Sequence, residues 1–251
     1  MLIAPLAALL AMFSPSVAKE PTDFLTRQKQ SARVRDALRD KGEALTRKLG
    51  ERGLSPQALN VLFVAYKAEG VLELHAKRPD AARYERFAAY RICTSSGALG
   101  PKRKQGDRQV PEGFYRIDRF NPASRYHLSL GVSYPNAADR RKSHAADLGG
   151  DIFIHGDCVT IGCLPMTDDK IEEIYLYALY ARASGQQEIP IYIFPFRMSA
   201  QNMDDYAAQF RRNPELVAFW RNLKQGYDRY TADGKALRVR VEANGDYTFG
   251  E

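Results

Sequence analysis

The sequence predicts a mixed α+β fold that is mainly β, and three observations lead to this prediction. Between residues 57 and 197, short apolar runs alternate with turns rich in Gly, Pro, Ser and Asn, which is typical of strands in a sheet. One helical pattern is embedded in this region, directly after a motif with two cysteines. Helical patterns also occur before residue 57 and after residue 197. We therefore expect one main domain, residues 57–197, between a helical arm, residues 19–56, and an α/β extension, residues 198–251.

The chain starts with an apolar segment, residues 1–18, that contains no charged side chain. It ends in Ser16-Val17-Ala18, small residues of the kind that signal peptidase cleaves after. The segment is shorter than the roughly 20 apolar residues of a membrane-spanning helix. We expect a signal peptide and an exported protein that begins at Lys19.

The arm reads as a helix from Asp23 to Gly50. Its apolar residues recur at helical spacing on one face, and they are Val34, Leu38, Leu45 and Leu49. Charged residues occupy the other positions, so this face is expected to pack on the main domain.

The main domain begins with a β-hairpin, in which residues 60–67 and 71–77 flank the turn Ala68-Glu69-Gly70. Further strands are expected within residues 86–93, 113–120, 126–134, 151–156 and 189–196. Thr167 precedes two carboxylates and a long apolar pattern that stops at Gly185, which predicts an N-cap and a helix.

The extension turns helical again from Met198. Asn213-Pro214 is a typical helix start, and residues 237–249 form a hairpin pattern around Asn244-Gly245.

The chain carries a formal net charge of +7, and such a basic surface fits several anionic partners. It lacks a recognition helix and an aromatic stacking pattern, so nucleic acid is not an expected partner. It also lacks a glycine-rich phosphate loop, and no cofactor is expected.

The segment IHGDCVTIGCLPM has the properties of a cysteine nucleophile site. A thiolate needs a nearby base or positive electrostatics, and His155 ends a strand where its ring direction would be fixed. Gly156 and Gly162 allow tight turns and a close approach of substrate to the backbone. Cys163 lies just ahead of the helix expected near Thr167, whose N–H groups are expected to lower the thiol pKa and to hold an oxyanion.

Other arrangements of these residues stay open. His155, Cys158 and Cys163 are possible zinc ligands with His144 as a fourth, but the spacings are irregular, and we predict no metal site. A disulfide is open between Cys158 and Cys163, or between Cys158 and Cys93. With three cysteines in an exported chain, at least one thiol stays free.

These motifs resemble the signature of the L,D-transpeptidase (YkuD-type) catalytic domain, and particularly its YafK-like branch. The signature is a strand ending in His-Gly, followed by Ser or Thr, any residue, and Gly-Cys. The matching residues are Ile154-His155-Gly156, Thr160-Ile161-Gly162-Cys163, Lys104-Gln105-Gly106-Asp107, Pro111-Glu112-Gly113-Phe114-Tyr115, Leu130 to Asn136, and Asp139-Arg140. The resemblance covers about residues 61–196.

The resemblance implies a β-sandwich-like catalytic domain and a two-step acyl transfer on peptidoglycan stem peptides. The Cys163 thiolate would attack the carbonyl at the L-centre of meso-diaminopimelate. His155 would take the thiol proton and then protonate the leaving amine. An amine or water would resolve the thioester, giving transpeptidation or hydrolysis.

The resemblance also suggests roles around the nucleophile. Gly162 and Gly156 are expected at the oxyanion and the substrate, and Tyr134 in the cleft. Thr160 either orients His155 or a substrate amide, or only stabilises the turn.

Two departures from the family pattern bear on the substrate. Leu164 and Pro165 follow the cysteine where many members have an Arg two residues on, and the interval from His155 to Cys163 is short. Both features are similar to those of the YafK-like branch. This resemblance implies a periplasmic enzyme, and as an alternative to transpeptidation it implies a hydrolase that detaches a lysine-linked lipoprotein from peptidoglycan. A non-catalytic peptidoglycan-binding protein is the rival from another class.

Overall fold

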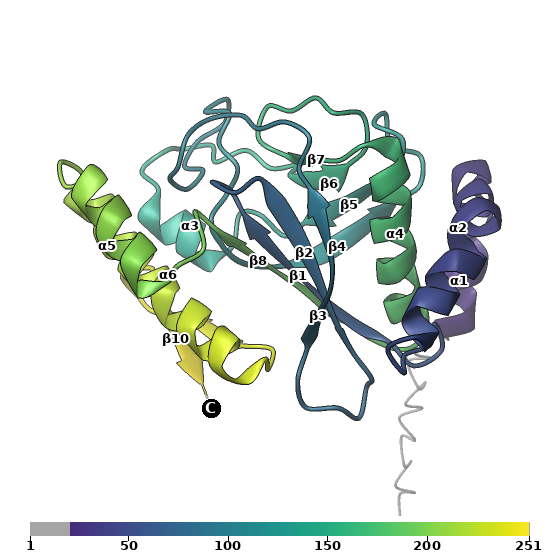
Figure 1. The fold of residues 1–251 in the computed structure, drawn as a ribbon. Helices are drawn as coiled ribbons and strands as arrows, with labels where there is room; N and C mark the ends of the chain where they lie inside the picture. The colour runs from purple at the N-terminus through teal and green to yellow at the C-terminus, as the bar shows by residue number, and fades with distance from the viewer. Residues whose placement is uncertain (1–20, 251) are drawn as a thin grey trace, which may run out of the picture.

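The computed structural model describes residues 21–250, so the predicted signal peptide lies outside the described residues. A curled eight-stranded sheet forms the centre, with helices on both faces (Figure 1). The strand order is β3-β2-β1-β8-β4-β5-β6-β7. The strands are β1 (Asn60–Tyr66), β2 (Val71–Lys77), β3 (Glu85–Arg91), β4 (Gly113–Asn121), β5 (Ser129–Val132), β6 (Phe153–His155), β7 (Leu164–Pro165) and β8 (Ile189–Phe194). This mixed architecture confirms the predicted fold class.

Most neighbouring strands are antiparallel, including the predicted hairpin of β1 and β2. The pairs β1–β8 and β6–β7 are parallel. Only the loop of residues 156–163 joins β6 to β7, and helix α4 (Asp168–Ala183) then leads from β7 at the edge of the sheet back to β8 near its centre. Thr167 caps α4 as predicted, because its side chain accepts a hydrogen bond from the backbone N–H of Lys170.

One face of the sheet is covered by α4 and the arm. The arm is not one continuous helix as expected, but two: α1 (Pro21–Gln28) and α2 (Ala32–Gly50). The break falls where Ser31 is extended and its hydroxyl donates to the carbonyl of Pro122, 3.3 Å away. The apolar face of α2 packs on the core as predicted, with Val34 and Leu49 fully buried.

The opposite face is covered by the extension. It consists of α5 (Ala200–Gln209), α6 (Pro214–Asp233) and a hairpin of β9 (Arg238–Val241) and β10 (Tyr247–Gly250), all as predicted. Asn213 caps α6 and Pro214 is its first residue. Trp220 is completely buried, and it packs edge-on against Phe196 from the end of β8 and Phe210.

Two short elements were not predicted. Helix α3 (Ala137–Lys142) begins with a capping box, in which Asn136 and Asp139 each accept a hydrogen bond from the other's backbone N–H. Strand β7 has only two residues, too few for any periodic pattern. Within residues 21–250, no helix has the length and apolar character needed to cross a membrane.

Candidate active site

The β6–β7 pair carries the two residues that the sequence singles out. Its register pairs Ile154 with Leu164, and both side chains are buried in the core. Cys163 lies one residue before β7, so the same register places it opposite Phe153. Side chains alternate along a strand, and paired residues of parallel strands share a face. Cys163 and His155 therefore lie on the same face of the pair, opposite the core.

His155 is held in a defined orientation and tautomer. Its ring is 2% exposed and lies 4.7 Å from the ring of Tyr126. Nδ1 lies 2.6 Å from the carbonyl oxygen of Gly156. Because a carbonyl only accepts, Nδ1 carries the proton and Nε2 keeps its lone pair. Burial lowers the pKa of His155 below 6.5, against the opposing effect of the Gly156 bond, so the ring is neutral at pH 7 and can act as a base.

Cys163 is a half-buried free thiol. Burial raises its pKa, Asp151 raises it further, and a backbone hydrogen bond from Phe153 and the charge of Lys102 oppose this. The expected lowering by the helix is not found, because β7 separates Cys163 from α4. At neutral pH the group is a thiol, and its sulfur lies 3.6 Å from the carbonyl oxygen of Asp151. Attack therefore requires a base.

Thr160 organises the turn that leads into the nucleophile. Its Oγ1 accepts from the backbone N–H of Cys163 at 2.8 Å and of Gly162 at 3.1 Å, and it donates to the carbonyl of Cys163. Of the roles left open for Thr160, the structure supports the turn-stabilising one. Gly162 has φ +138°, and a Cβ there would lie 3.1 Å from the carbonyl oxygen of Gln109. The turn therefore requires glycine at this position.

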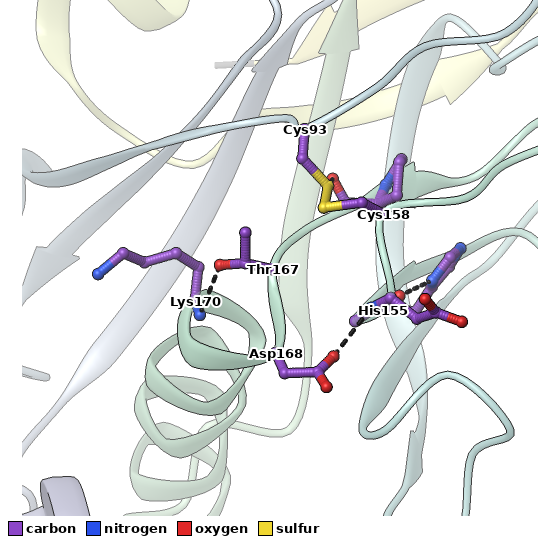
Figure 2. Close-up of a disulfide and its surroundings, with 9 residues drawn as sticks. Cys93, His155, Cys158, Thr167, Asp168 and Lys170 are labelled. Carbon is purple, nitrogen blue, oxygen red and sulfur yellow. Dashed lines mark hydrogen bonds between the residues drawn. A yellow bond between two sulfur atoms is a disulfide. The ribbon is translucent and has the colours of Figure 1, made fainter.

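Gly156 lies where helix α4 meets the loop after β6. Its N–H donates to the carbonyl of Tyr126 at 3.0 Å, and a Cβ there would collide with the carboxylate of Asp168. That carboxylate, on the first residue of α4, accepts from the N–H of Asp157 at 2.9 Å (Figure 2). The helix start thus fixes the loop that follows His155.

A disulfide joins Cys93, just after β3, to Cys158 in the same loop (Figure 2). Cys93 also donates its N–H to the carbonyl of Pro165 at 3.0 Å. One of the two predicted alternatives is thereby confirmed, and the Cys158–Cys163 pairing is wrong. The zinc set that included Cys158 is excluded as well, because its sulfur is used. In the part of the chain described, no group of three or more His, Cys, Asp or Glu residues could hold a metal ion.

Cys163 opens into a cleft of about 870 Å³. The cleft runs along the ends of β1, β2 and β3, and its other walls are the segment 93–99 and Val110. His155 does not line it, and within residues 21–250 there is no hydrogen bond between His155 and Cys163. Of the two residues, the thiol of Cys163 is therefore the one that faces the cleft.

A buried ion pair between Glu112 and Lys67 supports the far wall of the cleft, formed by Lys67 and Val110. Sequence reasoning found Glu112 only as a member of the matching segment of residues 111–115 and predicted no role for its carboxylate. Glu112 is fully buried, and its carboxylate contacts Lys67 Nζ at 2.8 Å, the N–H of Gly100 at 2.7 Å and Trp220 Nε1 at 2.9 Å. The Lys67 ammonium also donates to the carbonyls of Gly100 and Val110. The extension is therefore bonded to the segment that forms the cleft.

Two further candidates lie away from the cleft. Tyr134 is buried, and its hydroxyl donates to the carbonyl of Leu148 at 3.2 Å, so the structure does not bring it to the cleft wall. His144 lines a separate cavity between α6 and the loop after α3, together with Arg141 and Lys142.

Comparison with known proteins gives one family. The L,D-transpeptidase catalytic domain (YkuD) matches residues 73–193. The chain is 39% identical over 193 residues to the protein named "Putative L,D-transpeptidase YafK" of Escherichia coli strain K12, which covers 76% of this chain and 74% of that protein. The protein of the same name in E. coli O157:H7 gives the same values.

Solved structures include similar chains. The helical cell shape determining protein Pgp2 from Campylobacter jejuni is 15% identical, with a TM-score of 0.44 and 73% of each chain covered. Bd1075 from Bdellovibrio bacteriovorus is 22% identical, with a TM-score of 0.40, covering 62% of this chain and 56% of that one.

Proposed function

This chain belongs to the L,D-transpeptidase catalytic domain family, whose members act on peptidoglycan stem peptides, and we propose that it is a cysteine acyltransferase with Cys163 as its nucleophile. The observation that carries the proposal is the β6–β7 pair. It presents a free thiol at a cleft and a neutral histidine on the same face.

The first step transfers the thiol proton of Cys163 to Nε2 of His155. The thiol leaves the carbonyl of Asp151 as its side chain rotates, and the sulfur attacks the carbonyl at the L-centre of meso-diaminopimelate. The Gly156 carbonyl stabilises the imidazolium that forms, because it accepts the Nδ1 proton. His155 then gives its proton to the leaving amine, and a thioester remains on Cys163.

The oxyanion of the tetrahedral intermediate needs donors, and we assign the N–H groups of Gly162 and Cys163 to this role. Both point at Thr160 Oγ1 in the free protein. An N–H can be shared between two acceptors in a three-centre bond, so Thr160 fixes the direction of both donors before substrate arrives.

The thioester is resolved by an amine or by water. An amine acceptor gives a new peptide bond, and water gives hydrolysis, which on a lysine-linked stem would release a lipoprotein. The chemistry at Cys163 is the same in both cases. Analysis of the products separates transpeptidation from hydrolysis.

We also propose that the protein works in the periplasm. A disulfide such as Cys93–Cys158 is typical of oxidising compartments, and the apolar residues 1–18 fit an export signal. Cell fractionation tests this proposal, and recovery of the full-length chain with cytoplasmic markers would contradict it.

Mass spectrometry of peptidoglycan fragments incubated with the enzyme tests the main proposal. New diaminopimelate cross-links indicate transpeptidation, and loss of lipoprotein-linked stems without new cross-links indicates hydrolysis. The Cys163→Ala variant should form neither product. The matched control is the double variant Cys93→Ser/Cys158→Ser, which loses cysteines but keeps the nucleophile and should retain measurable turnover. Turnover by Cys163→Ala, or a wild-type protein that binds stems without changing them, would favour a non-catalytic peptidoglycan-binding protein.

A further inference from the structure

Arg91 is a cation without a partner in the cleft that Cys163 opens into. It is the last residue of β3, its side chain is exposed, and it lines the cleft together with Cys163. Within residues 21–250 its guanidinium makes no hydrogen bond or ion pair. An arginine that is free in the apo protein keeps all five of its donors for a ligand.

The other charged side chains of the cleft are already engaged. The Lys67 ammonium is 7% exposed and donates to Glu112 and to two backbone carbonyls, which uses its three N–H groups. The carboxylate of Glu69 accepts from the backbone N–H of Arg197 at 2.8 Å. Of the two cations in the described lining of this cleft, Arg91 is thus the one whose N–H groups are free for a ligand.

The backbone around Arg91 is held firmly relative to Cys163. Arg91 pairs with Val71 on β2, and the next residue, Ile92, donates its N–H to the carbonyl of Gly70 at 2.8 Å. Cys93 then bonds to Pro165 of β7 and to the loop before Cys163 through the disulfide. The guanidinium is therefore mounted on the same hydrogen-bonded framework as the nucleophile.

Alternation along the chain gives the direction of the Arg91 side chain. Ile92 packs into the core, so its neighbours Arg91 and Cys93 lie on the opposite side. Cys93 on that side reaches Cys158 in the loop that precedes Cys163. The arginine therefore lies on the side of β3 that carries the cleft, as its place in the cleft lining also shows.

We propose that Arg91 forms a carboxylate subsite, which binds a free carboxylate of the substrate next to the bond that Cys163 attacks. The inference rests on the proposed function, because a stem peptide supplies the carboxylate. A guanidinium binds a carboxylate through two parallel N–H···O bonds, which fixes orientation as well as affinity. In a tetrapeptide stem, two carboxylates flank the scissile bond: that of the D-centre of diaminopimelate and that of the terminal alanine.

Binding in the Cys163→Ala background tests the subsite without turnover. The ligands are a tetrapeptide stem, the same peptide amidated at the diaminopimelate D-centre, and the same peptide amidated at its C-terminus, measured by calorimetry. Adding Arg91→Gln should weaken binding of the free acid about tenfold or more, and Arg91→Lys should weaken it less. With one of the two amides, Arg91→Gln should make no difference, and that amide identifies the carboxylate.

Arg86→Gln is the matched control, because Arg86 is on the same strand, loses the same charge and does not line the cleft. Its affinity should equal that of the parent. An Arg91→Gln variant that binds all three peptides as tightly as its parent, or more weakly by one common factor, would overturn the subsite. Turnover by the wild type tests the proposed function separately. If the wild type has no activity but binds stem peptides with an affinity that depends on Arg91, the proposed enzyme is contradicted and the subsite is supported.

Discussion

Thr160 holds the backbone of Cys163 on both sides of its Cα atom. Its hydroxyl oxygen accepts from the Cys163 N–H at 2.8 Å, and the same hydroxyl donates to the Cys163 carbonyl at 3.1 Å. The nucleophile therefore lies on a turn whose geometry depends on a side chain three residues earlier. Because Gly162 donates to the same oxygen, one hydroxyl orients both N–H groups assigned to the oxyanion.

We expect Thr160→Val to lower kcat by about tenfold or more, since it removes the acceptor that orients two N–H groups while keeping the size of the side chain. KM should change less, because Thr160 is not among the residues that line the cleft. Thr160→Ser keeps the hydroxyl and is the matched control, with kcat expected near wild type. Steady-state kinetics on a defined stem peptide measures both, and equal losses in the two variants would contradict this role.

The protonation of His155 should set the acid limb of the pH profile. A protonated ring cannot accept the thiol proton, so kcat/KM falls as the pH drops through the pKa of His155. Burial lowers that pKa, and the acid limb is therefore expected below the ordinary value of 6.5. The measurement is kcat/KM between pH 4.5 and 8.5, chosen around that value. A midpoint above 7 would indicate a thiolate–imidazolium pair instead of a neutral base.

Much of the fold could be predicted from the sequence because its elements carry local signals. The hairpin of β1 and β2, the cap at Thr167 and the turn at Asn244-Gly245 each depend on residues close in the chain. The break between α1 and α2 could not be predicted, because it accompanies a contact between Ser31 and Pro122, which are far apart in sequence. Strand β7 was missed because two residues have no period.

The candidate site also has a part that could be predicted and a part that could not. His155 and Cys163 could be singled out, because the strand end and the glycine-cysteine motif that mark them are formed by residues close together in the sequence. The role of the Glu112 carboxylate could not be predicted, because its partners are far from it in the sequence: Lys67 follows β1 and Trp220 lies on α6. The predicted lowering of the Cys163 pKa is wrong, because β7 separates the thiol from the helix N-terminus and burial raises the pKa.

Removing the disulfide should destabilise the protein and disturb the nucleophile loop. The bond closes a loop with a sequence separation of 65, for which chain entropy gives about 4 kcal/mol in the free energy of unfolding. Cys93→Ser/Cys158→Ser should lose stability of this order in urea unfolding, and reductant should lower the wild type to the same level. The variant should also show a lower kcat, because Cys158 lies between His155 and Cys163. Unchanged stability in reductant would contradict the bracing role of the bond.

The bond between Trp220 and Glu112 should couple the extension to the cleft. Trp220→Phe keeps an aromatic ring among its aromatic neighbours and removes the donor to a fully buried carboxylate, which should cost about 1–3 kcal/mol. Glu112→Gln leaves the Lys67 ammonium without its counter-charge and should cost more, about 3–5 kcal/mol. Both losses are measured by urea unfolding.

The same variants should raise KM, because Val110 and Lys67 form part of the cleft wall and depend on Glu112 for their position. Tyr206→Phe is the control, since Tyr206 stacks on Phe196 beside Trp220 but makes no bond to Glu112. It should leave KM unchanged. If Trp220→Phe lowers stability as expected while KM stays at the wild-type value, the extension supports the fold alone and not the cleft. If KM rises in Trp220→Phe and rises more in Glu112→Gln, α6 holds the far wall of the cleft in place and that wall is part of the site.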